Sequence, residues 1–222
     1  MHARMIASLI FFAGGALFIA TGAGATPVQV QFSGALTTVD ADLSSRLAVG
    51  QQFTGTYTYE PSTPGPFSTP NTGVYLDAIS AMTVTFPDYI ASGPVGGGIF
   101  IENDQPVGAD FRDAYSISLN IGGDSIGIFN LNQVNLILST LQATPPTVLD
   151  TIALTQPLPS PSLFDTQLFW LVFFNDEFTE QRNVMGTITG LTAISIPEPE
   201  TLLLVGLGLA GIGLSHRCKR AN

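Results

Sequence analysis

The sequence predicts an all-β fold, an antiparallel two-sheet β-sandwich of the jelly-roll or immunoglobulin-like kind, from three observations. Apolar residues alternate with polar ones over many short runs, which is the period of a strand with one buried face. Gly, Pro, Asn or Asp bounds nearly every run. No stretch between residues 26 and 196 keeps a helical apolar period over three turns. Because the loops are too short for crossover helices, we expect antiparallel strands.

Nine runs are predicted to be strands. The first is typical, because Val28, Val30 and Phe32 alternate with polar residues. The run 168–174 is apolar at every position, which predicts a central strand buried on both faces. The run 184–194 is rich in Thr and Ile and predicts the closing strand. The expected strands are 28–33, 53–59, 82–86, 115–119, 126–131, 134–138, 148–154, 168–174 and 184–194.

The remaining segments are predicted to be loops, with one ambiguity. Residues 60–73 and 157–161 are rich in Pro and Ser and predict exposed, extended loops. Residues 131–141 are the one segment whose pattern also fits a helix. By length, residues 26–196 form a single domain that can bury a substantial core.

The charge of this domain is strongly acidic. Residues 26–196 hold 15 Asp or Glu and only three cations, Arg46, Arg112 and Arg182, so the net charge is 3 − 15 = −12. Such a surface repels phosphate, which argues against nucleic acid as a partner and against binding to anionic lipid. No cysteine lies in this segment, so no disulfide stabilises it.

The same segment lacks the residues on which most catalytic sites depend. It contains no histidine, no cysteine and no lysine. Ser-His-Asp and Cys-His nucleophiles, Ser-Lys dyads, Schiff-base lysines and His or Cys zinc sites are therefore excluded. The glycines at 96–98 lack the Lys and helix of a phosphate-binding loop. We expect no cofactor and a non-enzymatic protein.

Carboxylate chemistry stays open as an alternative. A glycan hydrolase or lyase needs two carboxyl groups at a set separation. The glutamates that could supply them are Glu60, Glu102, Glu177 and Glu180, each beside a turn signal. The sequence does not say which of them lie close together.

A calcium site is a second alternative. Glu102, Asp104, Asp110 and Asp113 fall within 12 residues, and hard oxygen ligands suit Ca²⁺. Their spacing lacks the EF-hand pattern, and a solvated turn accounts for the same composition. A Ca²⁺-stabilised adhesion module would use this cluster. Residues 175–177 form a smaller acidic group that predicts a hairpin turn.

Aromatic side chains could stack on sugar rings. Phe67 lies in a Pro-rich loop and Tyr89 follows a Pro-Asp pair, so both are expected at the surface. Trp170 lies within the apolar run 168–174 and is expected in the core.

The first 25 residues predict a secretory signal peptide. Arg4 lies before an apolar stretch at 5–20, and Ala23-Gly24-Ala25 forms a small-x-small cleavage site. Cleavage after Ala25 would follow export through the Sec machinery and would leave Thr26 as the first residue.

The C-terminal residues combine three features. Pro197, Glu198 and Pro199 precede Thr201, and two prolines at this spacing predict an extended joint. An apolar run from Leu202 to Leu214 follows, which as a helix is roughly 20 Å long and a marginal span for a bilayer core of about 30 Å. The cations Arg217, Lys219 and Arg220 then predict a cytoplasmic tail. Cys218 lies among these cations.

These C-terminal residues resemble the PEP-CTERM sorting domain of exported Gram-negative bacterial proteins. The resemblance covers residues 196–222 and rests on Pro197-Glu198-Pro199-x-Thr201, the short apolar segment and the basic end. It implies processing by an exosortase-type membrane protease or transpeptidase, in bacteria that make exopolysaccharide. We therefore expect an envelope or extracellular-matrix protein that is anchored for a time in the inner membrane and then reaches the cell surface or the medium. Binding of polysaccharide would suit that location.

Overall fold

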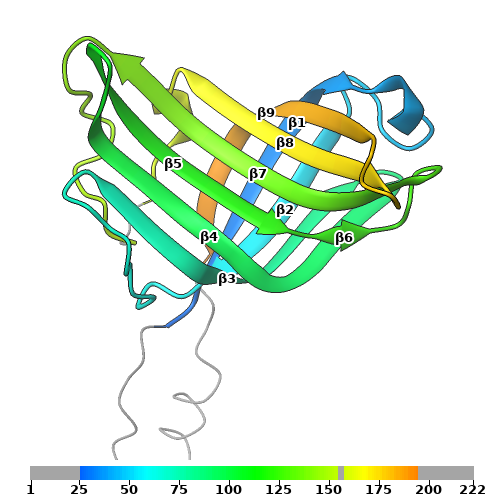
Figure 1. Ribbon diagram of the computed structural model, residues 1–222, viewed down its shortest axis with the longest axis horizontal. Coiled ribbons are helices and arrows are strands. Elements are labelled where there is room, and N and C mark those ends of the chain that lie inside the picture. Colours follow the sequence, from blue (N-terminus) through cyan, green and yellow to red (C-terminus); the bar gives the residue numbers. More distant parts are fainter. Residues whose placement is uncertain (1–25, 155–157, 195–222) are drawn as a thin grey trace, which may run out of the picture.

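The fold is a closed, eight-stranded antiparallel β-barrel (Figure 1). The computed structural model describes residues 26–154 and 158–194. The barrel strands follow one another around the barrel in chain order, and the last closes on the first. They are β1 (Val28–Val39), β2 (Gln52–Tyr59), β3 (Thr72–Phe86), β4 (Tyr89–Val107), β5 (Asp110–Asn120), β7 (Phe129–Gln142), β8 (Thr166–Asn175) and β9 (Gln181–Ile194).

Three short elements complete the described chain. The two-residue strand β6 (Gly122–Gly123) pairs with β4 outside the closed ring. The 3₁₀ turns η1 (Ala41–Leu43) and η2 (Pro161–Leu163) lie in the β1–β2 and β7–β8 loops. In the part of the chain that the structure describes, no helix has the length and apolar character needed to cross a membrane. The predicted signal peptide and the predicted helix at 202–214 lie outside the described residues.

The predicted two-sheet sandwich is wrong. The pairing of β3 with β4 and of β9 with β1 leaves no gap at which two sheets could separate. Alternation in sequence reports that one face of a strand is buried, and it has the same period whether that face meets a second sheet or a barrel interior. The prediction of an antiparallel, all-β domain is confirmed.

Most predicted strands fall within observed ones, with the following departures. Residues 148–154 form a loop, and Ile126 makes only an isolated bridge to Phe129. The segment 131–141 belongs to β7 and is not helical. β4 was not predicted. The expected two-sided burial of 168–174 holds only in part, because Leu168, Trp170 and Phe174 are partly exposed on the outer face while Val172 is buried there.

Aromatic side chains fill much of the barrel interior. The ring of Phe169 stacks on that of Phe53 with 4.2 Å between centroids, and both side chains are buried. Room for such rings comes from inward-facing glycine: a Cβ on Gly55 would lie 2.2 Å from Cζ of Phe32. An eight-stranded barrel is just wide enough for side chains to fill. The interior rings of this cluster are Phe32, Phe53, Tyr57, Tyr59, Phe86, Tyr89, Phe169 and Phe173.

A pair of buried tyrosines joins opposite walls. The hydroxyl groups of Tyr57, on β2, and Tyr115, on β5, lie 3.1 Å apart and share a hydrogen bond. Burial raises the pKa of both phenols above the ordinary value, because the phenolate would lose its hydration. Both hydroxyls therefore stay protonated across the physiological range and link the walls without adding charge.

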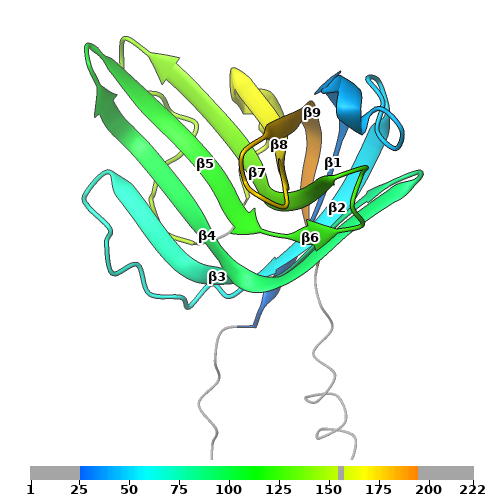
Figure 2. The ribbon, with the colours of Figure 1, turned by 45° about the vertical axis from the view of Figure 1, so that its right-hand side comes forward.

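The two ends of the barrel differ in what they carry. We call the end at which the described barrel segment begins and ends the tail end: Gln29, near the start of β1, pairs with Ile194, and Val28 pairs with Tyr59. It also holds the β2–β3, β4–β5 and β7–β8 connections. The opposite, free end holds the β1–β2, β3–β4, β5–β7 and β8–β9 connections (Figures 1 and 2). All barrel strands lie between residues 28 and 194, so this segment contains the contacts that fold it.

Candidate functional site

The β8–β9 connection at the free end is built around one asparagine. The side-chain oxygen Oδ1 of Asn175 accepts the backbone N–H groups of Thr179, at 2.9 Å, and Glu180, at 3.1 Å. Its Nδ2 donates to Oγ1 of Thr179 at 2.9 Å, and its own carbonyl accepts the N–H of Phe178 at 3.0 Å. Four hydrogen bonds to one residue fix the turn, which confirms the hairpin predicted at 175–177.

This turn displays an aromatic side chain. Phe178 is 67% exposed and has a φ of 56°, a left-handed conformation that non-glycine residues seldom adopt. Among the described residues its ring contacts one other ring, that of Phe174, with centroids 5.6 Å apart. An exposed phenylalanine held in a strained backbone is a feature that folding alone does not require, and such strain collects at functional positions.

A shallow hollow of about 150 Å³ lies beside these two rings. We call it the free-end groove. Asn130 donates from Nδ2 to Oδ1 of Asp176 at 2.7 Å, which bridges β7 and the turn. Within the described residues the Asn132 carboxamide has no hydrogen-bond partner. The groove is lined by Asn130, Leu131, Asn132, Phe174, Asn175, Asp176 and Phe178.

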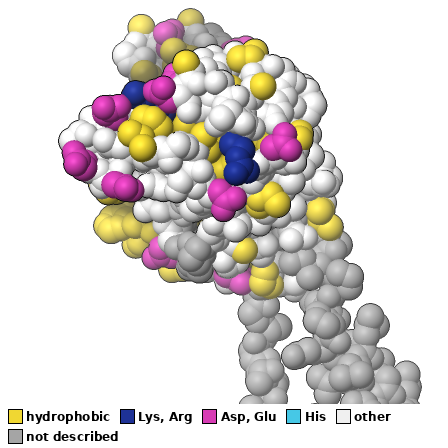
Figure 3. Space-filling view, turned by 90° about the vertical axis from the view of Figure 1, so that its right-hand side faces the viewer, with side chains coloured by type: hydrophobic (Ala, Val, Ile, Leu, Met, Phe, Trp, Pro, Cys, Tyr) yellow, Lys and Arg dark blue, Asp and Glu magenta, His cyan; other side chains and the backbone are white. Residues whose placement is uncertain are grey.

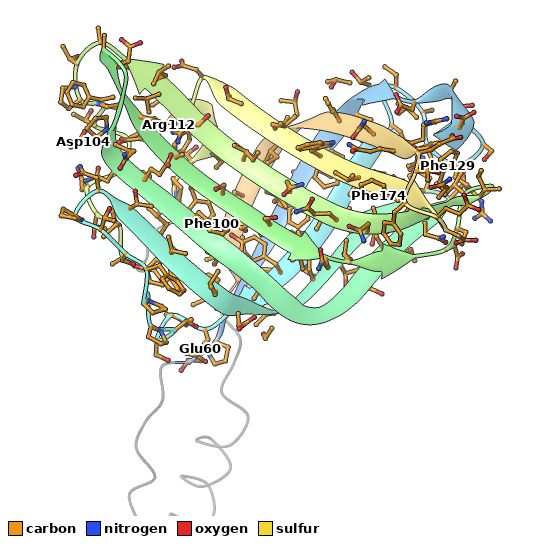
Figure 4. All side chains as sticks on the ribbon, in the orientation of Figure 1. Glu60, Phe100, Asp104, Arg112, Phe129 and Phe174 are labelled. Carbon is orange, nitrogen blue, oxygen red and sulfur yellow. The ribbon has the colours of Figure 1, made fainter. Side chains whose placement is uncertain are left out.

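A cation supports the barrel wall near the groove. The guanidinium of Arg182 lies 4.6 Å from the centroid of the Phe129 ring and forms ion pairs with Asp42, at 2.5 Å, and Glu180, at 2.9 Å. These contacts tie the β1–β2 loop and the turn to the wall. Figure 4 shows Phe129 and Phe174 together at this end, and Figure 3 shows that apolar side chains here lie among acidic ones.

The arrangement suits recognition of a sugar. Aromatic faces pack against the C–H face of a pyranose ring, and amides and carboxylates bond to its hydroxyl groups. The groove places both kinds of group side by side, and its turn is already fixed before a ligand arrives.

The predicted calcium ligands lie elsewhere, around the β4–β5 hairpin (Figure 4). Glu102 forms an ion pair with Arg112 at 2.5 Å. Asp113 is buried, and its two oxygens accept backbone N–H groups from Asp104, Val148 and Leu149 at 2.8, 3.1 and 2.9 Å. Asp110 is the first residue of β5, directly after the β4–β5 turn. Across the described residues, no three His, Cys, Asp or Glu side chains gather in a metal-binding arrangement.

The four glutamates weighed for hydrolysis are split between the two ends. Glu60 and Glu102 lie toward the tail end, where Glu60 accepts a hydrogen bond from Ser62 at 2.9 Å. Glu177 and Glu180 lie in the β8–β9 connection, and Glu180 is paired with Arg182. In the described structure no more than two of these glutamates therefore lie at one place. Glu177 and Glu180, which share the β8–β9 connection, both lie on an exposed turn.

The observed exposure of the aromatic candidates agrees with the predictions for only some of them. Phe67 is exposed, as expected, whereas Tyr89 is buried and the expectation of a surface ring there is wrong. Trp170 lies partly exposed on the outer face, outside the core, and donates from Nε1 to Oδ1 of Asn183 at 3.0 Å. Phe178 was missed. Its signal was an aromatic residue placed among acidic residues in a predicted hairpin turn, where nothing is available to bury it.

Comparison with known proteins identifies the C-terminal segment. A family model, the PEP-CTERM protein-sorting motif, matches residues 195–217. The match contains Pro197, Glu198, Pro199 and Thr201 and extends to Arg217, while Lys219 and Arg220 follow it. No curated protein and no solved structure matches the chain. The predicted sorting signal is thus confirmed, and it supports an exported, membrane-transiting protein that an exosortase-type enzyme sorts.

Proposed function

We propose that this exported barrel is a non-enzymatic envelope or extracellular-matrix protein that binds polysaccharide in its free-end groove. The observation that carries the proposal is Phe178, held exposed in a left-handed conformation by a turn that Asn175 fixes. Its ring and that of Phe174 supply a surface for a sugar face, and Asn132 and Asp176 supply groups for its hydroxyls.

The charge around the groove selects the kind of polysaccharide. Asp176, Glu177 and Glu180 lie in the same connection, and the cation Arg182 beside them is neutralised by two carboxylates. A chain of uronic acids or phosphorylated sugars would meet like charge there. The proposed ligand is therefore a neutral polysaccharide, recognised through C–H faces and hydroxyl groups.

The sorting motif sets the orientation of the barrel. β9 ends at Ile194 and the motif begins at residue 195, so the motif follows directly on the tail end. While an exosortase-type enzyme or the inner membrane holds that tail, the groove lies at the far end of the barrel. We propose that the barrel is displayed in this way in the periplasm after Sec export, and then at the cell surface or in the matrix.

A glycan array tests the ligand. The segment 26–196 is expected to bind neutral glycans, and Phe178→Ala to reduce that binding roughly tenfold, which corresponds to the loss of a contact worth about 1.4 kcal/mol. The matched control is Phe67→Ala, because Phe67 is 65% exposed but lies in the β2–β3 loop at the other end. Equal loss in both variants, or binding of Phe178→Ala at the native level, would exclude the groove.

A localisation assay tests the sorting step separately. In a host that has an exosortase-type enzyme, Pro197→Ala with Pro199→Ala is expected to leave the protein in the inner membrane. The measurement is fractionation of inner membrane, outer surface and medium. Release of the double variant at the native rate would contradict processing at this motif, and it would leave the glycan result untouched.

A further inference from the structure

A second concavity lies at the tail end, between the barrel interior and the β7–β8 loop. Its volume is about 250 Å³. Small-molecule pockets usually measure roughly 300–1,000 Å³, so this cavity lies near the lower limit for a small ligand. Ile101 and the rings of Tyr59 and Tyr115 form its floor, and Leu149, Leu154 and Leu163 lie on the loop side.

The loop side of the cavity is fixed by hydrogen bonds on both flanks. The buried carboxylate of Asp113 accepts the N–H groups of Val148 and Leu149, which locks the start of the loop over the barrel. The Tyr75 hydroxyl donates to the carbonyl oxygen of Ile152 at 2.7 Å. Further along, the hydroxyl of Thr140 donates to the carboxylate of Asp165. These hydrogen bonds fix residues 148–152 of the wall before a ligand arrives, so this part of the lining would need little ordering on binding.

The lining defines the chemistry that the cavity accepts. Most lining side chains are apolar, and no Arg is among them. The one charged group in the lining is the carboxylate of Asp150, which is exposed. Thr151 and Ser160 add hydroxyl groups that can donate or accept. An anionic ligand would therefore find no countercharge, and a large polar ligand would lose hydration without compensation.

From these observations we infer that the tail-end cavity binds a small, neutral and mostly apolar molecule with a single polar group. A medium-chain aliphatic alcohol has this chemistry: its chain would lie over Ile101, Leu149 and Leu154, and its hydroxyl would reach the Thr151 or Ser160 side. This activity is separate from binding of polysaccharide, which the free-end groove serves.

The test is a titration of the segment 26–196 with butanol, hexanol, decanol and hexanoate, read by NMR chemical shifts of the loop amides and by thermal unfolding. Hexanol is expected to bind saturably and to raise the melting temperature, since a ligand specific to the folded state stabilises it. Hexanoate is expected to bind at least about tenfold more weakly. No saturable shift with any alcohol, or equal binding of hexanoate, overturns the inference.

Two variants tie the binding to this cavity. Ala153→Phe fills it, because Ala153 is a lining residue, and is expected to abolish hexanol binding. Ala143→Phe is the matched control, because Ala143 is exposed in the same loop outside the lining, and is expected to bind as the native chain does. If Ala153→Phe does not fold, Leu163→Ser replaces it: its side chain is 58% exposed, so the core is spared while an apolar wall is lost. Unchanged binding in the folded lining variant overturns the assignment.

Discussion

The two ends of this barrel are closed in different ways. Near the free end, stacked rings such as Phe53 and Phe169 fill the interior, and the hairpin turns 87–88 and 176–180 join the strands there. At the tail end Tyr59 and Tyr115 form the floor of a cavity, and described residues of the β7–β8 loop, among them Leu149 and Leu154, lie over it. As a result, the free-end groove lies on the outside of the barrel, whereas the tail-end cavity lies beneath the β7–β8 loop.

The side chains that fix the loops also differ between the two ends. Figure 4 places Phe129 and Phe174 at one end and Asp104, Arg112 and Glu60 toward the other. A buried carboxylate, Asp113, secures the tail-end loop, while a neutral carboxamide, Asn175, secures the free-end turn. Because the first is buried and the second is at the surface, their removal should have unequal effects.

Phe169→Ala gives the largest expected effect. Phe169 is fully buried and its ring stacks on Phe53, with Phe32 and Phe86 also adjacent. Its truncation would hollow the filled half of the barrel and lower the free energy of unfolding by about 3–5 kcal/mol. Urea unfolding followed by circular dichroism measures this loss. Phe67→Ala, which removes an exposed ring of the same type, should change it by less than about 0.5 kcal/mol. Similar losses of stability in Phe169→Ala and Phe67→Ala would contradict the expected difference between a buried and an exposed ring.

Asp113→Asn is expected to act more locally. An asparagine can keep one acceptor but turns an N–H₂ group toward donors, so one or two of the three backbone N–H groups lose their partner. The loss should be about 1–3 kcal/mol. Hydrogen exchange of the Val148 and Leu149 amides should accelerate, while the Thr179 and Glu180 amides, which Asn175 holds, should not.

Asp110→Asn, at the start of the same strand β5, serves as the control for the change of charge. It should leave exchange at Val148 and Leu149 as in the native chain. Faster exchange at both ends of the barrel in Asp113→Asn would show that the carboxylate supports the whole fold and that the tail-end loop is not an independent unit.

The sequence predicted strands far better than their closure. Alternation at Val28, Val30 and Phe32 identified β1 and its buried face, and the same reasoning located most other strands. Whether one sheet closes or two sheets stack depends on the β3–β4 and β9–β1 pairings, which are long-range or irregular and leave no local period. β4 was not predicted, because its run of glycines and its register shifts interrupt the alternation of apolar and polar residues.

The apolar segment 148–154 was misread for a physical reason. Its apolar residues face the tail-end cavity from a loop, and burial without a strand gives the same local composition as burial within one. The candidate sites depend on contacts between distant segments and were harder still. The pairing of Asn130 with Asp176 joins residues 46 positions apart, and nothing near either residue indicates the other.

Substitutions at Phe178 give the smallest expected effect on stability. Because its backbone is left-handed, two substitutions that both remove the ring should differ in stability but not in glycan binding. Phe178→Ala and Phe178→Gly both remove the ring and its contact with Phe174. Only glycine also relieves the positive φ, so Phe178→Gly should be more stable than Phe178→Ala by about 1 kcal/mol, measured by urea unfolding.

Both Phe178 variants should lose glycan binding equally, and hexanol binding at the tail end should stay at the native level in each. Equal stability of the two variants would mean that the turn relaxes away from φ 56° once the ring is gone, and that the aromatic contact, not the Asn175 hydrogen bonds, holds the conformation. In that case the free-end groove would be shaped by its own rings, in the way that packed rings shape the barrel interior.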